Sequence, residues 1–216
     1  MSNRLQLMSL RLPKFSSPAL GRECLLCGGD SADEMVCKCC MSSLPILDRA
    51  GGEVIAPFEY RFPIDRLVQR FKYGGDLAVG HWLARELAAR ASSASRPQVL
   101  VPVPVTRARL RSRGFNQAAQ IARVVSRALR IPVSLRALER VRDSPPQSAL
   151  GRRARRGNLR GAFACRARLD GRHVALVDDV ITTGATAAAA SHALKRAGAA
   201  RVEVWALART PDPWDR

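Results

Sequence analysis

The 216-residue sequence predicts an α/β protein with a mostly parallel sheet, because short apolar runs alternate with stretches of helical periodicity. Val99–Val101 and Val174–Val177 are apolar runs too short for a helix, which is typical of strands buried on both faces. Val202–Ala208 is a third apolar strand, and Glu53–Tyr60 contains a shorter one. Helical segments lie between these runs, as they do in proteins whose strands are joined by crossover helices.

Four helices are expected from apolar periodicity and from end signals. They run from Pro63 to about Lys72, over 77–91, from about 117 to Leu129, and over 187–197. Asp76 is suited to cap the second helix, and Gly198 to end the fourth. The first helix carries its apolar face on Ile64, Leu67, Val68 and Phe71, and the third on Ile121, Val124, Val125 and Ala128.

The length suits one domain with a small appendage, and a hydrophobic content of 47% is that of a globular protein. The net charge is +18, and all but four of the 36 basic residues are arginine. Such a field attracts polyphosphates and nucleic acids. Since arginine and alanine are abundant along the whole chain, a general compositional bias explains the charge equally well.

The first 21 residues have scattered basic side chains and no continuous apolar core, so they predict a flexible leader and not a signal peptide. No apolar run approaches the length of a transmembrane helix, so no membrane insertion is expected. A cytoplasmic location follows as an expectation, and there the six cysteines are not expected to form structural disulfides.

Two Cys-x-x-Cys pairs, Cys24/Cys27 and Cys37/Cys40, have the spacing of a tetrahedral zinc site. Four thiolates leave no open position on the metal, so this zinc would be structural. The nine residues between the pairs are fewer than is usual. Cys39 competes with Cys40 as the fourth ligand, and free or redox-active thiols remain the alternative. This module is expected over residues 22–50.

The apolar run 174–177 leads into two acids and a hydroxyl-rich loop, followed by an alanine-rich helix. Loop amides, threonine hydroxyls and a helix N-terminus together favour an anion such as phosphate. The candidate ligand residues are Asp178, Asp179, Thr182, Thr183, Gly184, Ala185 and Thr186. The alternative is a strand end with solvated acids and an ordinary helix cap.

The two acids would repel a bare phosphate. They make sense beside a ligand that carries hydroxyl groups or Mg²⁺ a few ångströms from its phosphate, as ribose 5-phosphate does. Arg140–Phe163, interrupted by prolines and crowded with arginines, predicts an active-site lid or a nucleic-acid contact, or else a solvated helical hairpin.

The stretch 174–186 closely resembles the phosphoribosyl pyrophosphate (PRPP) motif of type I phosphoribosyltransferases. The order of motifs along the chain, over about 24–209, resembles that of the ComF family. The motifs are the four cysteines, then Phe71–Asp76, Val101–Pro104 and Arg113–Gln117, and last the PRPP motif. That resemblance implies a type I phosphoribosyltransferase fold over 51–210, an N-terminal zinc module with four cysteine ligands, and a polar tail over 211–216. It also implies PRPP with Mg²⁺ as ligand, a link to DNA uptake and natural transformation, and single-stranded DNA as a partner.

The resemblance implies that Asp178 and Asp179 bind the ribose hydroxyls and that residues 182–186 bind the 5-phosphate. The loop Val103–Arg107 takes the place of the pyrophosphate loop, with Arg107 neutralising the leaving pyrophosphate; Asp178, Asp179 and Arg107 are thus the expected catalytic residues. Residues 147–163 would be the lid.

Three functions are open at this point. One is an active phosphoribosyltransferase with an unidentified acceptor. Another is a PRPP or nucleotide sensor that binds single-stranded DNA. The third is an interaction protein whose zinc module docks onto the DNA-uptake machinery.

Overall fold

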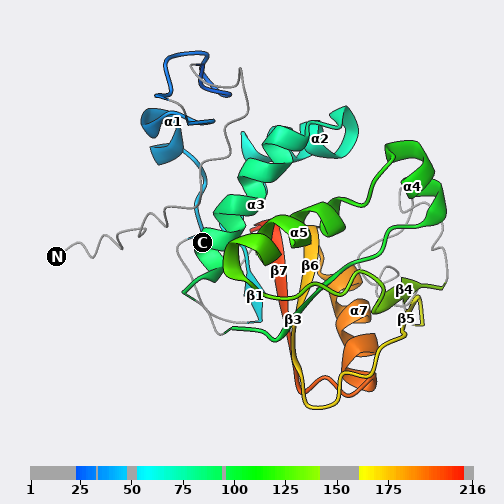
Figure 1. Ribbon diagram of the computed structural model, residues 1–216. Helices are drawn as coiled ribbons and strands as arrows, with labels where there is room; N and C mark the ends of the chain where they lie inside the picture. The colour runs from blue at the N-terminus through cyan, green and yellow to red at the C-terminus, as the bar shows by residue number, and fades with distance from the viewer. Residues whose placement is uncertain (1–22, 33, 48–52, 94–95, 142–160, 212–216) are drawn as a thin grey trace. The chain divides into compact units, whose positions relative to one another are not determined.

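The computed structural model describes residues 23–32, 34–47, 53–93, 96–141 and 161–211 (Figure 1). The expected leader and most of the tail lie outside these ranges. Contacts divide the chain into two compact units, Met1–Leu44 and Pro45–Arg216, and each is described by itself. The domain limits expected from the sequence therefore stay a prediction.

The N-terminal unit is built from turns, an isolated antiparallel bridge between Glu23 and Asp30, and helix α1 (Lys38–Ser42). Within 23–32 and 34–44, the part of this unit that the structure describes, the buried apolar side chains are Cys24, Val36 and Leu44. So small an apolar core contributes little to stability, which leaves the cysteines as the main means of holding this unit together.

The second unit contains a parallel sheet of order β1-β7-β6-β3, as the sequence predicts, with β2 also pairing with β7. Its strands are β1 (Val54–Ile55), β2 (Phe58–Glu59), β3 (Val99–Pro102), β6 (His173–Ile181) and β7 (Arg201–Arg209). A separate antiparallel pair joins β4 (Leu138–Arg140) to β5 (Phe163–Cys165). Both faces of β3 and of the first half of β6 are buried, which explains their continuous apolar sequence.

Two expectations about the strands need correction. The single strand expected over 53–60 is divided into β1 and β2, because Pro57 has no N–H to donate to a ladder. β6 is longer than the expected 174–177 and continues to Ile181 alongside β7. Asp178 and Asp179 therefore lie inside the strand and do not follow it.

The helices of this unit agree with the expected ones within two residues at each end, and one helix is new. They are α2 (Ile64–Gly74), α3 (Leu77–Ala91), α4 (Arg107–Arg113), α5 (Gln117–Leu129) and α7 (Ala185–Arg196). Asp76 caps α3 by accepting from the N–H of Val79 at 3.1 Å, as expected. Gly198, at φ 97°, follows the end of α7.

The buried side chains of α2 are the four that were expected, and on α5 two of the four expected side chains, Ile121 and Val125, are buried. Val124 and Ala128 are only half-buried, whereas the polar Gln117 is buried at the start of α5. The start of α5 packs against the end of α2, where Gln117 donates to the carbonyl of Lys72.

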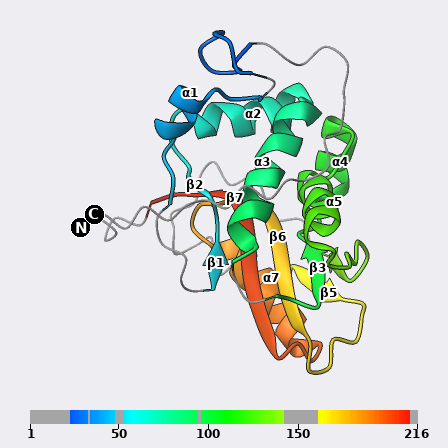
Figure 2. The same cartoon turned by 60° about the vertical axis from the view of Figure 1, so that its left-hand side comes forward.

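The sheet separates two helical layers in the views of Figures 1 and 2. On one face, α7 packs on Val174, Leu176 and Val204 in a single apolar cluster that also takes in residues of β4 and β5. Side chains of a strand alternate, so the intervening residues face α3 and α5, and α2 packs against α3. No helix of the described ranges is long and apolar enough to cross a membrane.

Candidate active site at the carboxyl edge of the sheet

The loops that follow β3 and β6 leave the sheet at the same edge, because the two strands are parallel neighbours. Pro102 is paired with Val177, and the N–H of Val103 donates to the carbonyl of Val177 at 2.8 Å. Ligands of open α/β sheets bind at such carboxyl edges.

The two acids of β6 face opposite layers. Asp178 continues the alternation of Val174 and Leu176, whose side chains pack against α7. Asp179 points the other way and forms an ion pair with Lys72. The two adjacent carboxylates therefore lie in different environments, one on the face of α7 and the other beside Lys72.

Asp178 shares a small hollow with the hydroxyl-rich loop. The hollow measures about 50 Å³ and is lined by Asp178, by 180–184 and by the start of α7, including Ala185 and Thr186. Gly184 takes φ 70° immediately before α7, and Thr183 Oγ1 accepts from the N–H of Ala185 at 3.5 Å. The first turn of a helix has N–H groups without helical partners, and together with its dipole they favour an anion here.

The pKa of Asp178 is raised to about 7. Burial is the main cause, followed by the negative charge of Asp179; the N–H of Asp179, at 2.8 Å, and the cations Lys72 and Arg109 act in the opposite direction. A carboxyl group with so high a pKa in a polar hollow is characteristic of functional sites.

Lys72 belongs to the site although the sequence did not single it out. Its Nζ lies 3.0 Å from Asp179 Oδ2, and the two side chains are 16% and 18% exposed. The only signal was that Lys72 is one of four lysines in an arginine-rich chain, within the stretch Phe71–Asp76 that carries the family resemblance. The pairing itself joins α2 to β6 and could not be read from local sequence.

The loop expected to hold pyrophosphate ends where α4 begins. Thr106 caps α4 by accepting from the N–H of Arg109 at 3.2 Å. Arg107 is the first residue of α4, and its side chain lies outside the described part of the chain. Arg109 is exposed and acts on the pKa of Asp178, which makes it a second cation at this edge.

Asn116 and Gln117 hold the surrounding backbone in place. Asn116 Nδ2 donates to the carbonyl of Val103 at 3.1 Å, while its Oδ1 caps α5. The buried Gln117 donates through Nε2 to the carbonyl of Lys72 at 3.4 Å. This explains the burial of a polar residue at the start of α5. The expected lid, 147–163, lies outside the described residues except for its last three positions.

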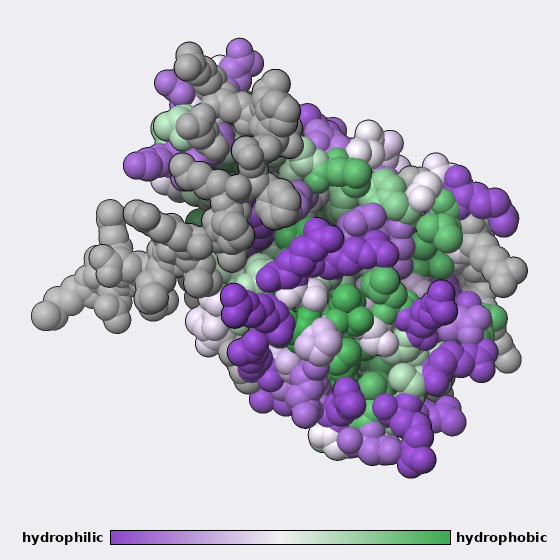
Figure 3. Space-filling model, viewed as in Figure 1, coloured by the Kyte–Doolittle hydropathy of each residue, from purple (hydrophilic) through white to green (hydrophobic). Residues whose placement is uncertain are grey.

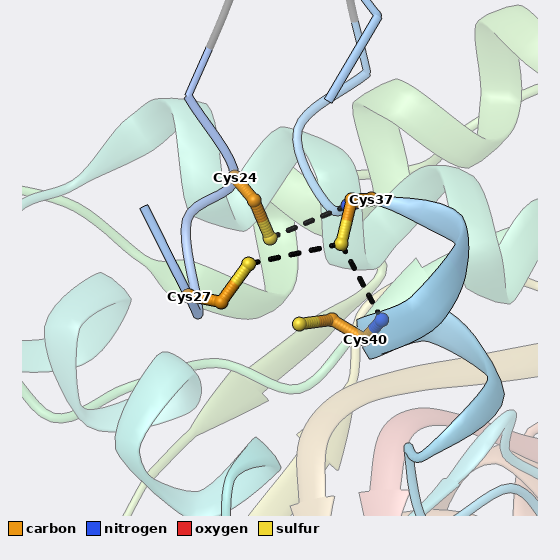
Figure 4. A group of neighbouring side chains, drawn as sticks. All are labelled: Cys24, Cys27, Cys37 and Cys40. Carbon is orange, nitrogen blue, oxygen red and sulfur yellow. Dashed lines mark hydrogen bonds between the residues drawn. The ribbon is translucent and has the colours of Figure 1, made fainter. Parts of the chain in front are cut away.

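In the N-terminal unit, the four predicted ligands come together (Figure 4). The Sγ atoms of Cys24, Cys27, Cys37 and Cys40 all lie within 4.8 Å of one another, and those of Cys27 and Cys37 are 3.8 Å apart. Zn–S bonds of about 2.3 Å in a tetrahedron place sulfur atoms about 3.8 Å apart. Cys39, the competing ligand, is exposed and outside the group, so Cys40 is the fourth member.

Backbone N–H groups point at the sulfur atoms of this cluster. The N–H of Cys37 donates to Cys24 Sγ at 3.3 Å, and that of Cys40 donates to Cys37 Sγ at 3.4 Å. The bond from Cys37 is the main reason that the pKa of Cys24 falls to about 6. Such donors stabilise thiolates and are typical of a metal's outer shell. The donor set fits zinc or a metal of similar chemistry.

Comparison with known proteins agrees with this architecture. Residues 84–216 match the phosphoribosyl transferase domain family. The chain belongs to this family and, within it, to the ComF family. It is 32% identical to DNA utilization protein YhgH of Escherichia coli K12, over 87% of this chain and 84% of that protein. It is 35% identical to competence protein F of Haemophilus influenzae, over 80% and 78%, and 27% identical to competence protein ComFC of Bacillus subtilis, over 88% and 79%.

Proposed function

We propose that the carboxyl edge of the sheet binds PRPP together with Mg²⁺ and that the protein is a phosphoribosyltransferase or a PRPP-binding relative of these enzymes. The observation that supports this most directly is the small hollow shared by Asp178 and the loop 182–186, next to the loop that follows β3. A phosphate group and a hydroxyl-bearing sugar are the two chemistries that such a hollow combines.

In this proposal the N–H groups and hydroxyls of 182–186 bind the 5-phosphate, and Asp178 and Asp179 accept hydrogen bonds from the ribose hydroxyls. The loop Val103–Arg107 lies toward the pyrophosphate, where Arg107 and Arg109 neutralise charge. Mg²⁺ would supply further neutralisation of the pyrophosphate. In a transfer reaction the C1–O bond breaks, pyrophosphate leaves with the bonding electrons, and a nitrogen of the acceptor forms the new bond to C1. The acceptor is not identified by these residues.

A role with DNA is the second candidate. The relatives are named for competence and DNA utilization, and α4 exposes Arg109 and Arg111 near the site. Hydrophilic side chains are spread over the face in Figure 3 and are interrupted by apolar ones. Few aromatic residues accompany the arginines, so binding of single-stranded DNA would depend mainly on phosphate contacts and would weaken as salt rises.

PRPP binding is tested by calorimetry with Mg²⁺ on the wild type and on Asp178→Asn/Asp179→Asn. Each lost hydrogen bond to a charged group is worth about 1.5–3 kcal/mol, so the affinity should fall at least tenfold. Asp170→Asn is the matched control, since this acid is 64% exposed and lies before the amino end of β6. An absence of PRPP binding by folded wild type would contradict the proposal and leave the DNA-binding function.

For the cysteine cluster we propose a structural zinc ion. Metal analysis should find about one zinc per chain in the wild type and in Cys39→Ser, and much less in Cys27→Ser. Loss of metal should disorder residues 23–44, as measured by proteolysis or NMR, because this unit has little core of its own. PRPP binding should survive the loss, and equal zinc content in Cys27→Ser and Cys39→Ser would contradict the assignment.

A further inference from the structure

Two carboxylates beside a phosphate-binding loop pose an electrostatic problem for any phosphorylated ligand. Asp178 and Asp179 are consecutive, and the loop 182–186 that would hold the phosphate begins three residues after Asp179. At distances of a few ångströms in a partly buried setting, like charges repel strongly. A cation has to offset them, and in this superfamily Mg²⁺ is the expected one.

The structure already contains a cation at this point. Lys72 Nζ is 3.0 Å from Asp179 Oδ2, and its positive charge also offsets part of the rise in the pKa of Asp178 that burial and Asp179 cause. Both members of the ion pair are more than four-fifths buried, so solvent screens them much less than a surface pair. An ammonium group has three N–H donors, so Lys72 can donate to a ligand while it stays paired with Asp179.

Lys72 is positioned by the fold and is not a freely moving surface lysine. It lies in the last turn of α2, and Gly75, which follows the helix, has a left-handed conformation with φ 65°. Its carbonyl accepts from the buried Gln117, and the preceding Phe71 is buried. A Cβ at Gly80 of α3 would overlap the Phe71 ring, so the glycine allows α2 and α3 to approach closely.

We propose that Lys72 is a built-in counter-charge of the site, which lets a ribose monophosphate with free 2- and 3-hydroxyl groups bind without a divalent metal. This inference rests on the proposed function and refines it. Lys72 neutralises Asp179 and places N–H donors beside the ligand, so the ribose 5-phosphate part needs no metal. Mg²⁺ is then required only for the pyrophosphate part of PRPP.

The test uses ribose 5-phosphate as probe, on the full-length protein, by calorimetry in EDTA and again in Mg²⁺. Wild type should bind with affinities within about threefold of each other in the two conditions. Lys72→Met keeps the aliphatic stem and removes the charge, and it should weaken binding in EDTA at least tenfold. Lys72→Arg should retain most of the affinity, and Lys195→Met, at an exposed position of α7, is the charge-matched control.

The metal dependence separates this role from a merely structural one. If Lys72→Met only damaged the fold, it would lower binding equally in EDTA and in Mg²⁺. The double variant Lys72→Met/Asp179→Asn removes both charges of the pair and should recover any thermal stability that Lys72→Met loses. Wild type that binds ribose 5-phosphate only with Mg²⁺, or Lys72→Met that binds it like the wild type in EDTA, would overturn the inference. Failure of the wild type to bind either ribose 5-phosphate or PRPP with Mg²⁺ would instead overturn the proposed function.

Discussion

Acidic side chains are largely buried at both ends of the β6–β7 pair, and the groups that surround the carboxylates differ between the two ends. At the amino end, Glu203 is 2% exposed and accepts from Trp205 Nε1 at 3.2 Å, while Arg201 pairs with it at 2.6 Å. His173 Nε2 lies 3.4 Å from the same carboxylate. At the carboxyl end, Asp178 and Asp179 share Lys72 as a neighbouring cation.

The difference separates an acid that is paired within the fold from an acid that we propose binds a ligand. The carboxylate of Glu203 is satisfied by side chains that belong to the fold, so it has little left to offer a ligand. Asp178 is opposed by burial and by Asp179, which raises its pKa, and its hollow opens onto a helix N-terminus. Keeping an acid in such a place costs stability, and a ligand that binds there can recover that cost.

Cavity size alone would not reveal this distinction. The hollow at the amino end is larger, about 300 Å³, and is lined by Glu53, Lys195, Glu203 and neighbouring residues. Its charges are of both signs and its buried acid is already paired. The smaller hollow at the other end has the chemistry that a phosphorylated sugar needs.

The largest effect is expected from Glu203→Ala. This change leaves the indole N–H of Trp205 and the cation of Arg201 without their buried partner, and it opens a small cavity. The free energy of unfolding should fall by about 3 kcal/mol, measured by urea denaturation. PRPP affinity of the folded protein should stay unchanged, because the residue is at the opposite end of the strands from the candidate site.

Glu139→Ala is the matched control for that experiment. Glu139 is 51% exposed and pairs with Arg166, so its removal should cost less than about 1 kcal/mol. If Glu203→Ala costs no more than Glu139→Ala, the amino-end acid is not stabilising and the contrast between the two ends is lost.

The carboxyl end could be predicted from the sequence where its signals are local. The apolar run, both acids and the loop 182–186 lie in one continuous stretch, and the two cysteine pairs carry their own spacing. A parallel sheet follows from the alternation of strands and helices. These features need no knowledge of which distant segments meet.

The parts that could not be predicted depend on contacts between distant segments. Lys72 reaches Asp179 from α2, and Gln117 is buried because it bonds to the backbone of Lys72. Glu203 lies in a strand predicted as apolar. Strand alternation places Arg201 and Trp205 on its face, but His173 reaches the same carboxylate from the neighbouring strand β6, and local sequence does not indicate this contact. The length of β6 was underestimated because its ladder with β7 extends it past the apolar run.

A smaller effect, opposite in sign to that of Glu203→Ala, is expected from Asp178→Asn. The folded protein raises the pKa of this acid from an ordinary value of 3.8 to about 7, so folding favours the neutral form. The contribution of neutral Asp178 to stability is fully present below the pKa that this acid has in the unfolded chain, and it is lost as the pH rises through about 7. Above that pH wild type carries an unfavourable charge, which the asparagine variant lacks.

Asp178→Asn should therefore match the wild type in unfolding free energy near pH 4 and exceed it by about 2 kcal/mol at pH 8. A pKa difference of one unit between the folded and unfolded states corresponds to about 1.4 kcal/mol of stability. Because Asp178 is partly exposed to solvent, the gain in unfolding free energy should be smaller than its whole pKa difference would give. Urea denaturation at both pH values, with Asp170→Asn beside it, cancels the titration of other groups. A gain that is equal at pH 4 and pH 8 would show that the charge of Asp178 is not what costs stability. A gain confined to high pH, together with weaker PRPP binding, would identify Asp178 as an acid that the fold retains for its ligand.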